Sequence, residues 1–146
     1  MKIYLDNCSL QRPLDDKTQL RISLEAEAVL GIIALNEKEI IEIVHSDALA
    51  YEMSRTPHPQ RKTFATEVLS SAKTYITFTK AVIDLAKTLE QHGIKPLDAL
   101  HVACASTAEV HYFCTCDDRL IKRLKTGPHL ACTVVTPLEL IQEILP

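Results

Sequence analysis

Short β-favouring segments alternate with helical segments along the whole chain, and this alternation limits the fold more than any other feature of the sequence. Strands are predicted at residues 2–6, 40–44, 112–115 and 132–136, whereas 75–78 is ambiguous. Helices are predicted at residues 17–36, 48–55, 60–71, 80–92, 96–109, 117–125 and 138–145. Strands that alternate with helices form a parallel sheet covered by helices. We therefore expect an α/β fold of three layers, in which a central, mainly parallel sheet lies between two layers of helices.

The length and charge of the chain limit its organisation and its partners. With 146 residues, 47% of them hydrophobic, the chain suffices for one packed core, and residues 1–146 are expected to form a single domain. The net charge of −3 argues against binding of nucleic acid through the overall charge. Trp is absent and only three Phe and four Tyr are present, which disfavours a platform that stacks successive bases. Any nucleic acid is therefore expected to be held locally, through its phosphates.

The N-terminus and the cysteines indicate a cytoplasmic protein without membrane contact. The apolar part of MKIYLDNCSL is too short for a secretion signal, and no apolar run reaches the ~20 residues of a membrane span. The five cysteines show no disulfide spacing, as expected for reduced thiols. A soft-metal site of Cys8, Cys114 and Cys116 is an alternative, but its Cys-x-Cys spacing differs from that of structural zinc sites.

Two aspartates lie at or just past the ends of predicted strands, and two further acids lie on predicted helices. Asp6 and Asp117 are expected at the same rim, because ligands of parallel sheets bind outside the carboxyl ends of the strands. Asp98 in the first turn of one helix and Glu52 on another join them if their helices reach that rim. Gathered carboxylates repel one another unless protons or a cation neutralise them, and oxygen ligands suit Mg²⁺ or Mn²⁺. The alternative roles are helix or loop caps for the aspartates and a solvated helix face for Glu52.

The residues around these acids resemble the PIN-domain family. The resemblance rests on Ile3-Tyr-Leu-Asp6, Ser46-Asp-Ala-Leu-Ala-Tyr-Glu52, Leu97-Asp-Ala-Leu-His-Val-Ala103 and Thr115-Cys-Asp117, and on the strand-Pro-helix pattern of 134–138. It implies a PIN-like, five-stranded parallel sheet between helices. It also implies a Mg²⁺- or Mn²⁺-dependent endoribonuclease in which a metal-activated water attacks the RNA. The metal-binding and catalytic residues implied are Asp6, Glu52, Asp98 and Asp117.

The same resemblance bears on partners. Many small members of the family are VapC-type toxins held inactive by an antitoxin, so a toxin–antitoxin pair with a cognate antitoxin is expected. We also expect a homodimer. A catalytically inactive scaffold that binds protein partners is the main alternative. A small phosphatase is a further alternative, although the chain has only three glycines and no Gly-rich phosphate loop.

Neighbouring side chains are candidates for supporting roles. Many family members have Asp-Thr-Asn or Asp-Thr-Ser after the first strand, whereas this chain has Asp6-Asn7-Cys8-Ser9. Asn7 and Ser9 are candidates either to bond a metal-bound water or to form a loop turn. His101 lies one helical turn from Asp98, where it either packs behind the site or faces the same ion.

The remaining candidates are the two aspartates after the strand predicted at 112–115 and the basic residues near the rim. Asp118 competes with Asp117 for the fourth acidic position, and the Thr-x-Asp pattern favours Asp117, which leaves Asp118 as the expected helix cap. Local positive charge near the rim is expected to bind the RNA backbone. The candidate RNA-binding residues are Arg12, Arg55, Arg119, Lys122 and Arg123.

Overall fold

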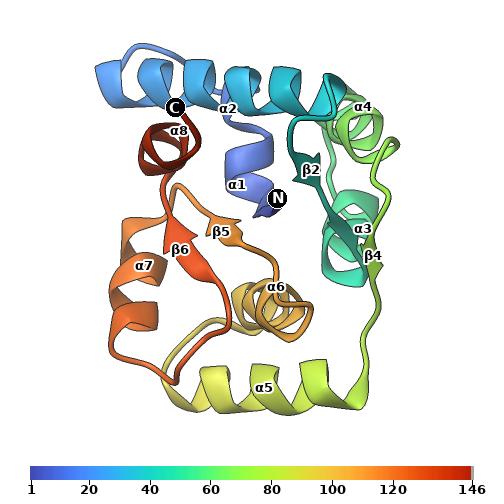
Figure 1. The fold of residues 1–146 in the computed structure, drawn as a ribbon, viewed down its shortest axis with the longest axis vertical. Coiled ribbons are helices and arrows are strands. Elements are labelled where there is room, and N and C mark those ends of the chain that lie inside the picture. Colours follow the sequence, from blue (N-terminus) through green and yellow to red (C-terminus); the bar gives the residue numbers. More distant parts are fainter. Residues whose placement is uncertain (146) are drawn as a thin grey trace.

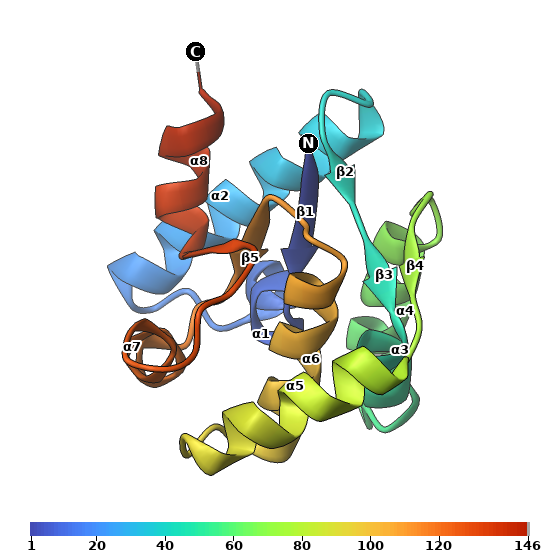
Figure 2. The ribbon, with the colours of Figure 1, turned by 60° about the horizontal axis from the view of Figure 1, so that its bottom comes forward.

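The computed structural model describes residues 1–145, and parallel strands lie at its centre. The strands β1 (Lys2–Leu5), β2 (Glu42–Ile43), β5 (Tyr112–Cys114) and β6 (Thr133–Val135) are arranged in the order β2-β1-β5-β6. A second parallel ladder joins β3 (His45–Ser46) to β4 (Tyr75–Ile76). Only Val44 separates β2 from β3, and Figure 2 shows the chain running from one into the other. The expected α/β fold with a parallel central sheet is confirmed.

Helices cover both faces of this sheet (Figure 1). One face carries α2 (Leu20–Glu37) and α8 (Pro137–Ile144), and the other carries α6 (Pro96–Thr107) with α5 (Lys80–Gln91) packed against it. The remaining helices are α1 (Asn7–Leu10), the short 3₁₀ helix η1 (Arg12–Leu14), α3 (Asp47–Ser54), α4 (Pro59–Leu69) and α7 (Asp118–Lys125). Within residues 1–145, no helix combines the length and the apolar character that crossing a membrane requires.

The central strand β1 is buried on both faces. Ile3, Tyr4 and Leu5 are all fully buried, as expected for a strand covered by helices on either side. The ring of Tyr4 packs against that of Phe113 on the neighbouring β5, with 5.5 Å between the ring centroids. The register pairs Leu5 with Cys114, so β1 and β5 end side by side. The residues that follow these two strands therefore lie at one edge of the sheet.

Side-chain caps start the helices that follow β1, β3 and β5. Asp6 caps α1, Ser46 caps α3 and Asp117 caps α7, and each accepts a hydrogen bond from a backbone N–H of the first helical turn. These caps fix short helices directly behind the strand ends. They also place two of the predicted acids, Asp6 and Asp117, at the carboxyl edge of the sheet.

Two local expectations differ from the structure. The segment after β1 was expected as a loop, but Asn7–Leu10 forms the helix α1, because the Asp6 carboxylate accepts from the Ser9 N–H and closes the first turn. The expected strand at 40–44 is shifted and interrupted. Glu39 has a left-handed backbone with φ of 58°, so the turn after α2 delays the strand until Glu42.

Candidate active site

The four predicted acids line one cavity of about 200 Å³ at the carboxyl edge of the sheet. They come from four separate places in the fold: the end of β1, helix α3, the first turn of α6 and the segment after β5. The cavity lining is Asp6, Asn7, Cys8, Arg12, Glu52, Asp98, His101, Cys116 and Asp117. Residues that are far apart in the sequence thus meet in one acidic pocket, and Asp118 is not part of it.

Asp6 is the most buried of these acids, with 5% of its surface exposed. Its Oδ1 accepts from the Ser9 N–H at 3.0 Å and from the Cys8 thiol at 3.1 Å. Burial raises the pKa of Asp6, and hydrogen bonds from Thr115, Cys8 and Ser9 offset part of this increase. The Ser9 hydroxyl donates to the Cys114 carbonyl at 3.1 Å, so it holds α1 against β5 and does not point into the pocket.

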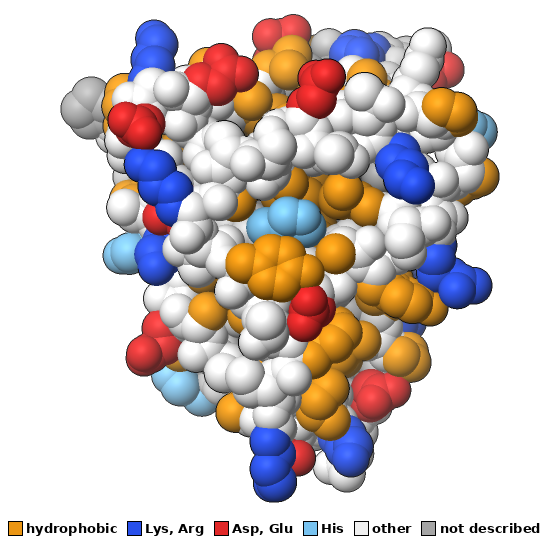
Figure 3. Space-filling view, turned by 90° about the vertical axis from the view of Figure 1, so that its right-hand side faces the viewer, with side chains coloured by type: hydrophobic (Ala, Val, Ile, Leu, Met, Phe, Trp, Pro, Cys, Tyr) orange, Lys and Arg blue, Asp and Glu red, His pale blue; other side chains and the backbone are white. Residues whose placement is uncertain are grey.

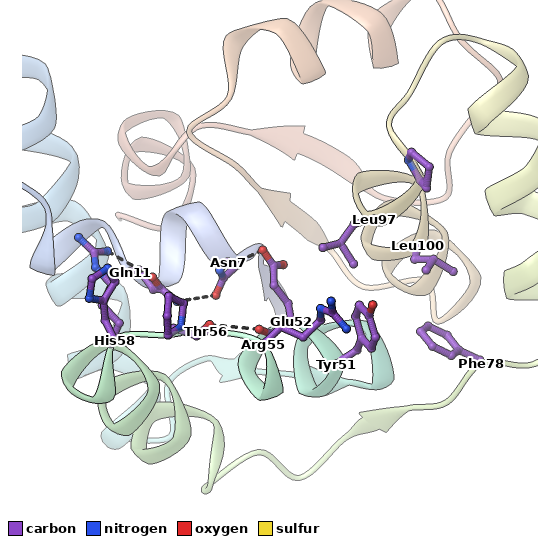
Figure 4. A pocket seen from close by; sticks show the side chains of 13 residues that line it. Asn7, Gln11, Tyr51, Glu52, Arg55, Thr56, His58, Phe78, Leu97 and Leu100 are labelled. Atoms are coloured by element: carbon purple, nitrogen blue, oxygen red, sulfur yellow. Dashed lines mark hydrogen bonds between the residues drawn. The ribbon is translucent and has the colours of Figure 1, made fainter.

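Glu52 is held by hydrogen bonds at both carboxylate oxygens. Asn7 donates to Oε2 over 3.0 Å, and His101 Nε2 lies 2.7 Å from Oε1 (Figure 4 shows the Asn7 contact). Behind the imidazole, the Tyr4 hydroxyl lies 2.7 Å from His101 Nδ1 and 2.6 Å from the Ser46 hydroxyl. Ser46, Tyr4 and His101 are all buried. A chain of hydrogen bonds therefore runs from the core of the protein to one acid of the pocket.

The direction of this chain follows from the chemistry of its ends. An ionised Glu52 only accepts, so a neutral His101 must carry its proton on Nε2 and accept at Nδ1. The Tyr4 hydroxyl then donates to Nδ1 and accepts from Ser46. Burial raises the pKa of Tyr4 well above its usual range, which keeps the phenol protonated as a donor. The chain thus fixes the histidine tautomer and the position of Glu52.

Asp98 is half-buried, and its carboxylate makes no hydrogen bond to another residue within 1–145. Burial is the largest cause that raises its pKa, and the negative charge of Asp6 is the next, with Asp117 and Glu52 adding to it. Asp98 is therefore the acid that most directly senses the excess negative charge of the pocket.

Asp117 lies in the pocket and also caps α7, with Oδ1 accepting from the N–H of Arg119 at 3.0 Å and of Leu120 at 3.2 Å. The expectation that Asp118 is the helix cap is wrong. Its carboxylate instead binds both Nη atoms of Arg21, at 2.6 and 2.8 Å, on the exposed surface. The nearby guanidinium lowers the pKa of Asp118.

The candidate RNA-binding residues lie in different surroundings. Arg12 lines the pocket, but its guanidinium binds Glu25 at 2.9 Å and Asp15 at 3.0 Å. Arg55 lies over the ring of Tyr51, 5.4 Å from its centroid. The other three candidates, Arg119, Lys122 and Arg123, are exposed on α7.

Sequence reasoning did not single out the fully buried Glu25 or the hydroxyl of Tyr4. For Glu25 a signal existed, because Arg21 stands four residues earlier on the same helix and the two side chains form an ion pair. For Tyr4 the pattern of β1 indicates only a core position. Its contact with His101 joins residues 97 positions apart, and such pairs are not visible in a single sequence.

The donor set of the acidic pocket suits a hard divalent cation. Carboxylate oxygens are the ligands that Mg²⁺ and Mn²⁺ prefer, and the repulsion felt by Asp98 is the interaction that such an ion would relieve. Within residues 1–145, however, no three His, Cys, Asp or Glu side chains are already gathered closely enough to form a metal site. The two pocket cysteines, Cys8 and Cys116, flank the acids, whereas Cys114 is buried in β5.

Comparison with known proteins bears on the family and the fold. Residues 3–126 match the family model of the PIN domain. Three solved structures share the fold: VapBC2 from Rickettsia felis bound to a DNA fragment from its promoter (TM-score 0.61, 17% identity, 93% of this chain and 98% of that chain), FitAcB from Neisseria gonorrhoeae (0.58, 15%, 93% and 98%), and FitAB bound to an IR36 DNA fragment (0.55, 15%, 92% and 94%). At these identities the likeness concerns the fold alone. Among curated proteins, no sequence matches the chain.

Proposed function

Because the chain belongs to the PIN-domain family, we propose that it is a metal-dependent endoribonuclease that hydrolyses RNA phosphodiester bonds. The observation that carries the proposal is the meeting of four carboxylates in one pocket of about 200 Å³. These acids come from four different elements, and helix capping accounts for only Asp6 and Asp117. Glu52 and Asp98 cap nothing, so their presence in the pocket supports a chemical role.

The metal would be held by Asp6, Glu52, Asp98 and Asp117. When bound, a Mg²⁺ or Mn²⁺ ion activates water for attack on the phosphodiester and stabilises the charge on the leaving oxygen. His101 and Asn7 keep Glu52 in place through its two oxygens, and the buried Tyr4 hydroxyl keeps the imidazole in the required tautomer. Asp98 has no such restraint and keeps its oxygens available to a ligand.

The RNA backbone would be held by the basic face of α7. This helix begins beside the pocket, directly after its cap Asp117, and carries Arg119, Lys122 and Arg123 on its exposed surface. Phosphate contacts from such side chains position a strand without reading its sequence. Arg12 is less suited to this role, because two carboxylates already neutralise it.

The biological context we propose is that of a toxin controlled by a cognate antitoxin. The likeness of fold to VapBC2 and FitAB, together with the resemblance to VapC-type toxins, supports this assignment. Co-expression with the neighbouring genes of the source organism tests it. Rescue of growth by a single neighbouring gene is the expected result.

The nuclease is tested by incubating a panel of single-stranded and structured RNAs with the protein in Mn²⁺, Mg²⁺ or EDTA. We expect cleavage with either ion, none in EDTA, and a loss of about a thousandfold in Asp98→Asn, because a ligand of the catalytic ion is removed. Asp118→Asn is the matched control, since it removes the same charge at an exposed site outside the pocket.

Each outcome separates the alternatives. Cleavage lost in Asp98→Asn and kept in Asp118→Asn supports the nuclease and the choice of acids. A wild type that cleaves no RNA and binds no divalent ion by calorimetry contradicts the proposal and leaves the inactive scaffold. A wild type that hydrolyses phosphate monoesters but not RNA would instead favour the phosphatase.

A further inference from the structure

A second and larger cavity, of about 710 Å³, lies directly beside the acidic pocket. The two cavities share Asn7 and Glu52, so one opens next to the other. Figure 4 shows Asn7 and Glu52 between two ends of the larger cavity, with Gln11 and His58 at one end and Tyr51, Phe78, Leu97 and Leu100 at the other. A molecule that reaches the acids through Glu52 therefore also meets this second space.

The end that carries Tyr51 and Phe78 is apolar and accessible. The two aromatic residues are 49% and 38% exposed, and both line the cavity. Leu97 and Leu100 of α6 line the opposite wall. Figure 3 shows hydrophobic side chains on the side of the molecule that carries β4, with both acidic and basic side chains among and around them.

A cation accompanies the aromatic wall. The Arg55 guanidinium lies over the Tyr51 ring, 5.4 Å from its centroid, and both residues line the cavity. Arg61 lines the other end, but it is bound to Asp15 at 2.8 Å and to Gln11 at 3.2 Å. Aromatic rings with a guanidinium stacked on one of them offer flat surfaces for a base and a positive charge for its phosphate. A purely apolar peptide face would gain nothing from the arginine.

We propose that this cavity binds one unpaired nucleobase of the RNA, next to the phosphodiester held at the acids, with the base against Tyr51 and Phe78. The inference rests on the proposed ribonuclease function, and it adds to that function a site for one base beside the cleaved bond. A base in a duplex is paired and stacked, so only a loop, a bulge or a single strand can turn a base into a side cavity. The small number of aromatic residues fits one such site and not a platform for successive bases.

The test measures the affinity of the protein for a short single-stranded RNA in EDTA, so that binding does not depend on cleavage. Each nucleotide is replaced in turn by an abasic one. In the wild type, we expect one abasic position to weaken binding about tenfold, the range known for loss of one stacked base. In Tyr51→Leu, the intact RNA should bind about tenfold more weakly, and the abasic replacement at that position should cause no further loss.

Two controls separate stacking from general damage. Tyr51→Phe keeps the ring and should bind like the wild type, whereas Tyr51→Leu keeps an apolar side chain without an aromatic face. Leu138→Ala truncates a side chain of similar exposure to Phe78, at 37%, on the distant α8, and should leave the affinity unchanged.

The outcomes are distinct from those of the cleavage assay. If no abasic replacement changes the affinity of the wild type for the RNA, the proposal of a base site is wrong, even if the protein cleaves RNA with Mn²⁺. An abasic replacement that weakens binding equally in the wild type and in Tyr51→Leu also contradicts the base site. A protein segment would then be the alternative occupant of the cavity. A selective abasic effect without any cleavage would keep the base site and contradict the nuclease.

Discussion

Two clusters of carboxylates lie close together in this protein, and they are neutralised in different ways. The first surrounds Glu25, which is fully buried and binds Arg12 at 2.9 Å and Arg21 at 3.4 Å. The second is the acidic pocket, where the only arginine in the lining, Arg12, is already bound to Glu25 and Asp15. One cluster thus contains its own counter-charges, and the other keeps an excess of negative charge.

The difference shows what each cluster is suited to do. A buried carboxylate with arginine partners fixes the chain, because each charge left without its partner would be costly. Here the ion pairs tie η1 to α2 through Arg12 and Glu25, and η1 to α4 through Asp15 and Arg61. A carboxylate cluster without its own cations is stabilised when it binds a cation from solution, because the cation reduces the repulsion between the carboxylates. The paired cluster therefore stabilises the rim, and the unpaired cluster is the place for chemistry.

The largest effect on folding is expected when the paired cluster loses its central cation. Arg12→Ala leaves the buried Glu25 with only the longer contact to Arg21, and should lower the free energy of unfolding by about 3 kcal/mol. Urea denaturation in EDTA measures the loss. Arg119→Ala, on the exposed face of α7, is the control and should change stability by less than about 0.5 kcal/mol.

A double variant sharpens this test. Arg12→Met with Glu25→Leu removes both charges and replaces them with apolar groups, so it should recover most of the lost stability. Equal stability of Arg12→Ala and the wild type would mean that Arg12 is not needed by Glu25. Arg12 would then return as a candidate for binding RNA.

The next largest effect concerns the unpaired cluster and a divalent ion. Mg²⁺ that binds only the folded state should stabilise the wild type by about 1.4 kcal/mol at a concentration ten times its dissociation constant. Asp98→Asn should lose most of this gain, whereas Asp118→Asn should keep it, since Asp118 lies outside the pocket and binds Arg21. Thermal unfolding at increasing Mg²⁺ measures the gain. The same Mg²⁺ dependence in all three proteins would place the ion elsewhere.

The sequence predicts the fold and the position of two acids, but it does not predict every part of the two clusters. The parallel α/β fold follows from the alternation of strands and helices, because that pattern is repeated over the whole chain. Asp6 and Asp117 lie at one rim as predicted, because each comes within a few residues of the end of a strand. The site itself stays a prediction until it is tested by mutation.

What the sequence does not predict depends on contacts between distant residues. The cap after β5 is Asp117, whereas Asp118 binds Arg21 from 97 residues away, a pairing that a local pattern does not contain. The commitment of Arg12 to Glu25 depends on how η1 packs against α2. Local patterns give the residue types but not these pairings. For that reason Arg12 is a candidate for RNA binding in the sequence and part of an ion-paired cluster in the structure.

The pH dependence of stability should have opposite signs in the two regions. The pKa of Asp98 is raised from its usual 3.8, mainly by burial, so the stability linked to it is full below pH 3.8 and is lost as the pH rises through the raised pKa. The pKa of Asp118 is lowered by Arg21, so the stability linked to it is present above pH 3.8 and is lost as the pH falls through the lowered pKa.

Urea denaturation of the wild type and both Asn variants between pH 3 and 7 in EDTA measures these slopes. As the pH rises from about 4 to 7, Asp98→Asn should gain stability relative to the wild type. As the pH falls from about 4 to 3, Asp118→Asn should gain relative to the wild type instead. Parallel curves for Asp98→Asn and the wild type would show that neither burial nor the neighbouring acids raise the pKa of Asp98 in the folded protein.

The smallest effect is expected at the exposed edge of the unpaired cluster. Arg119→Ala removes one proposed phosphate contact, and should weaken binding of single-stranded RNA about threefold at low salt. It should also reduce the slope of log affinity against log salt by about 0.7, the value for one phosphate on a single strand. Filter binding between about 50 and 200 mM salt measures both quantities.

Lys73→Ala is the matched control, because Lys73 is also exposed but binds Glu39 at 2.9 Å beside a different cavity, which includes Met1 at the start of the chain. If Arg119→Ala and Lys73→Ala reduce the salt slope equally, the RNA is held by charge spread over the surface, and α7 has no special part. If only Arg119→Ala reduces it, the strand passes along α7 toward Asp117. In that case the positive charge that binds the RNA backbone lies on α7, at the rim of the acidic pocket, and not inside the pocket.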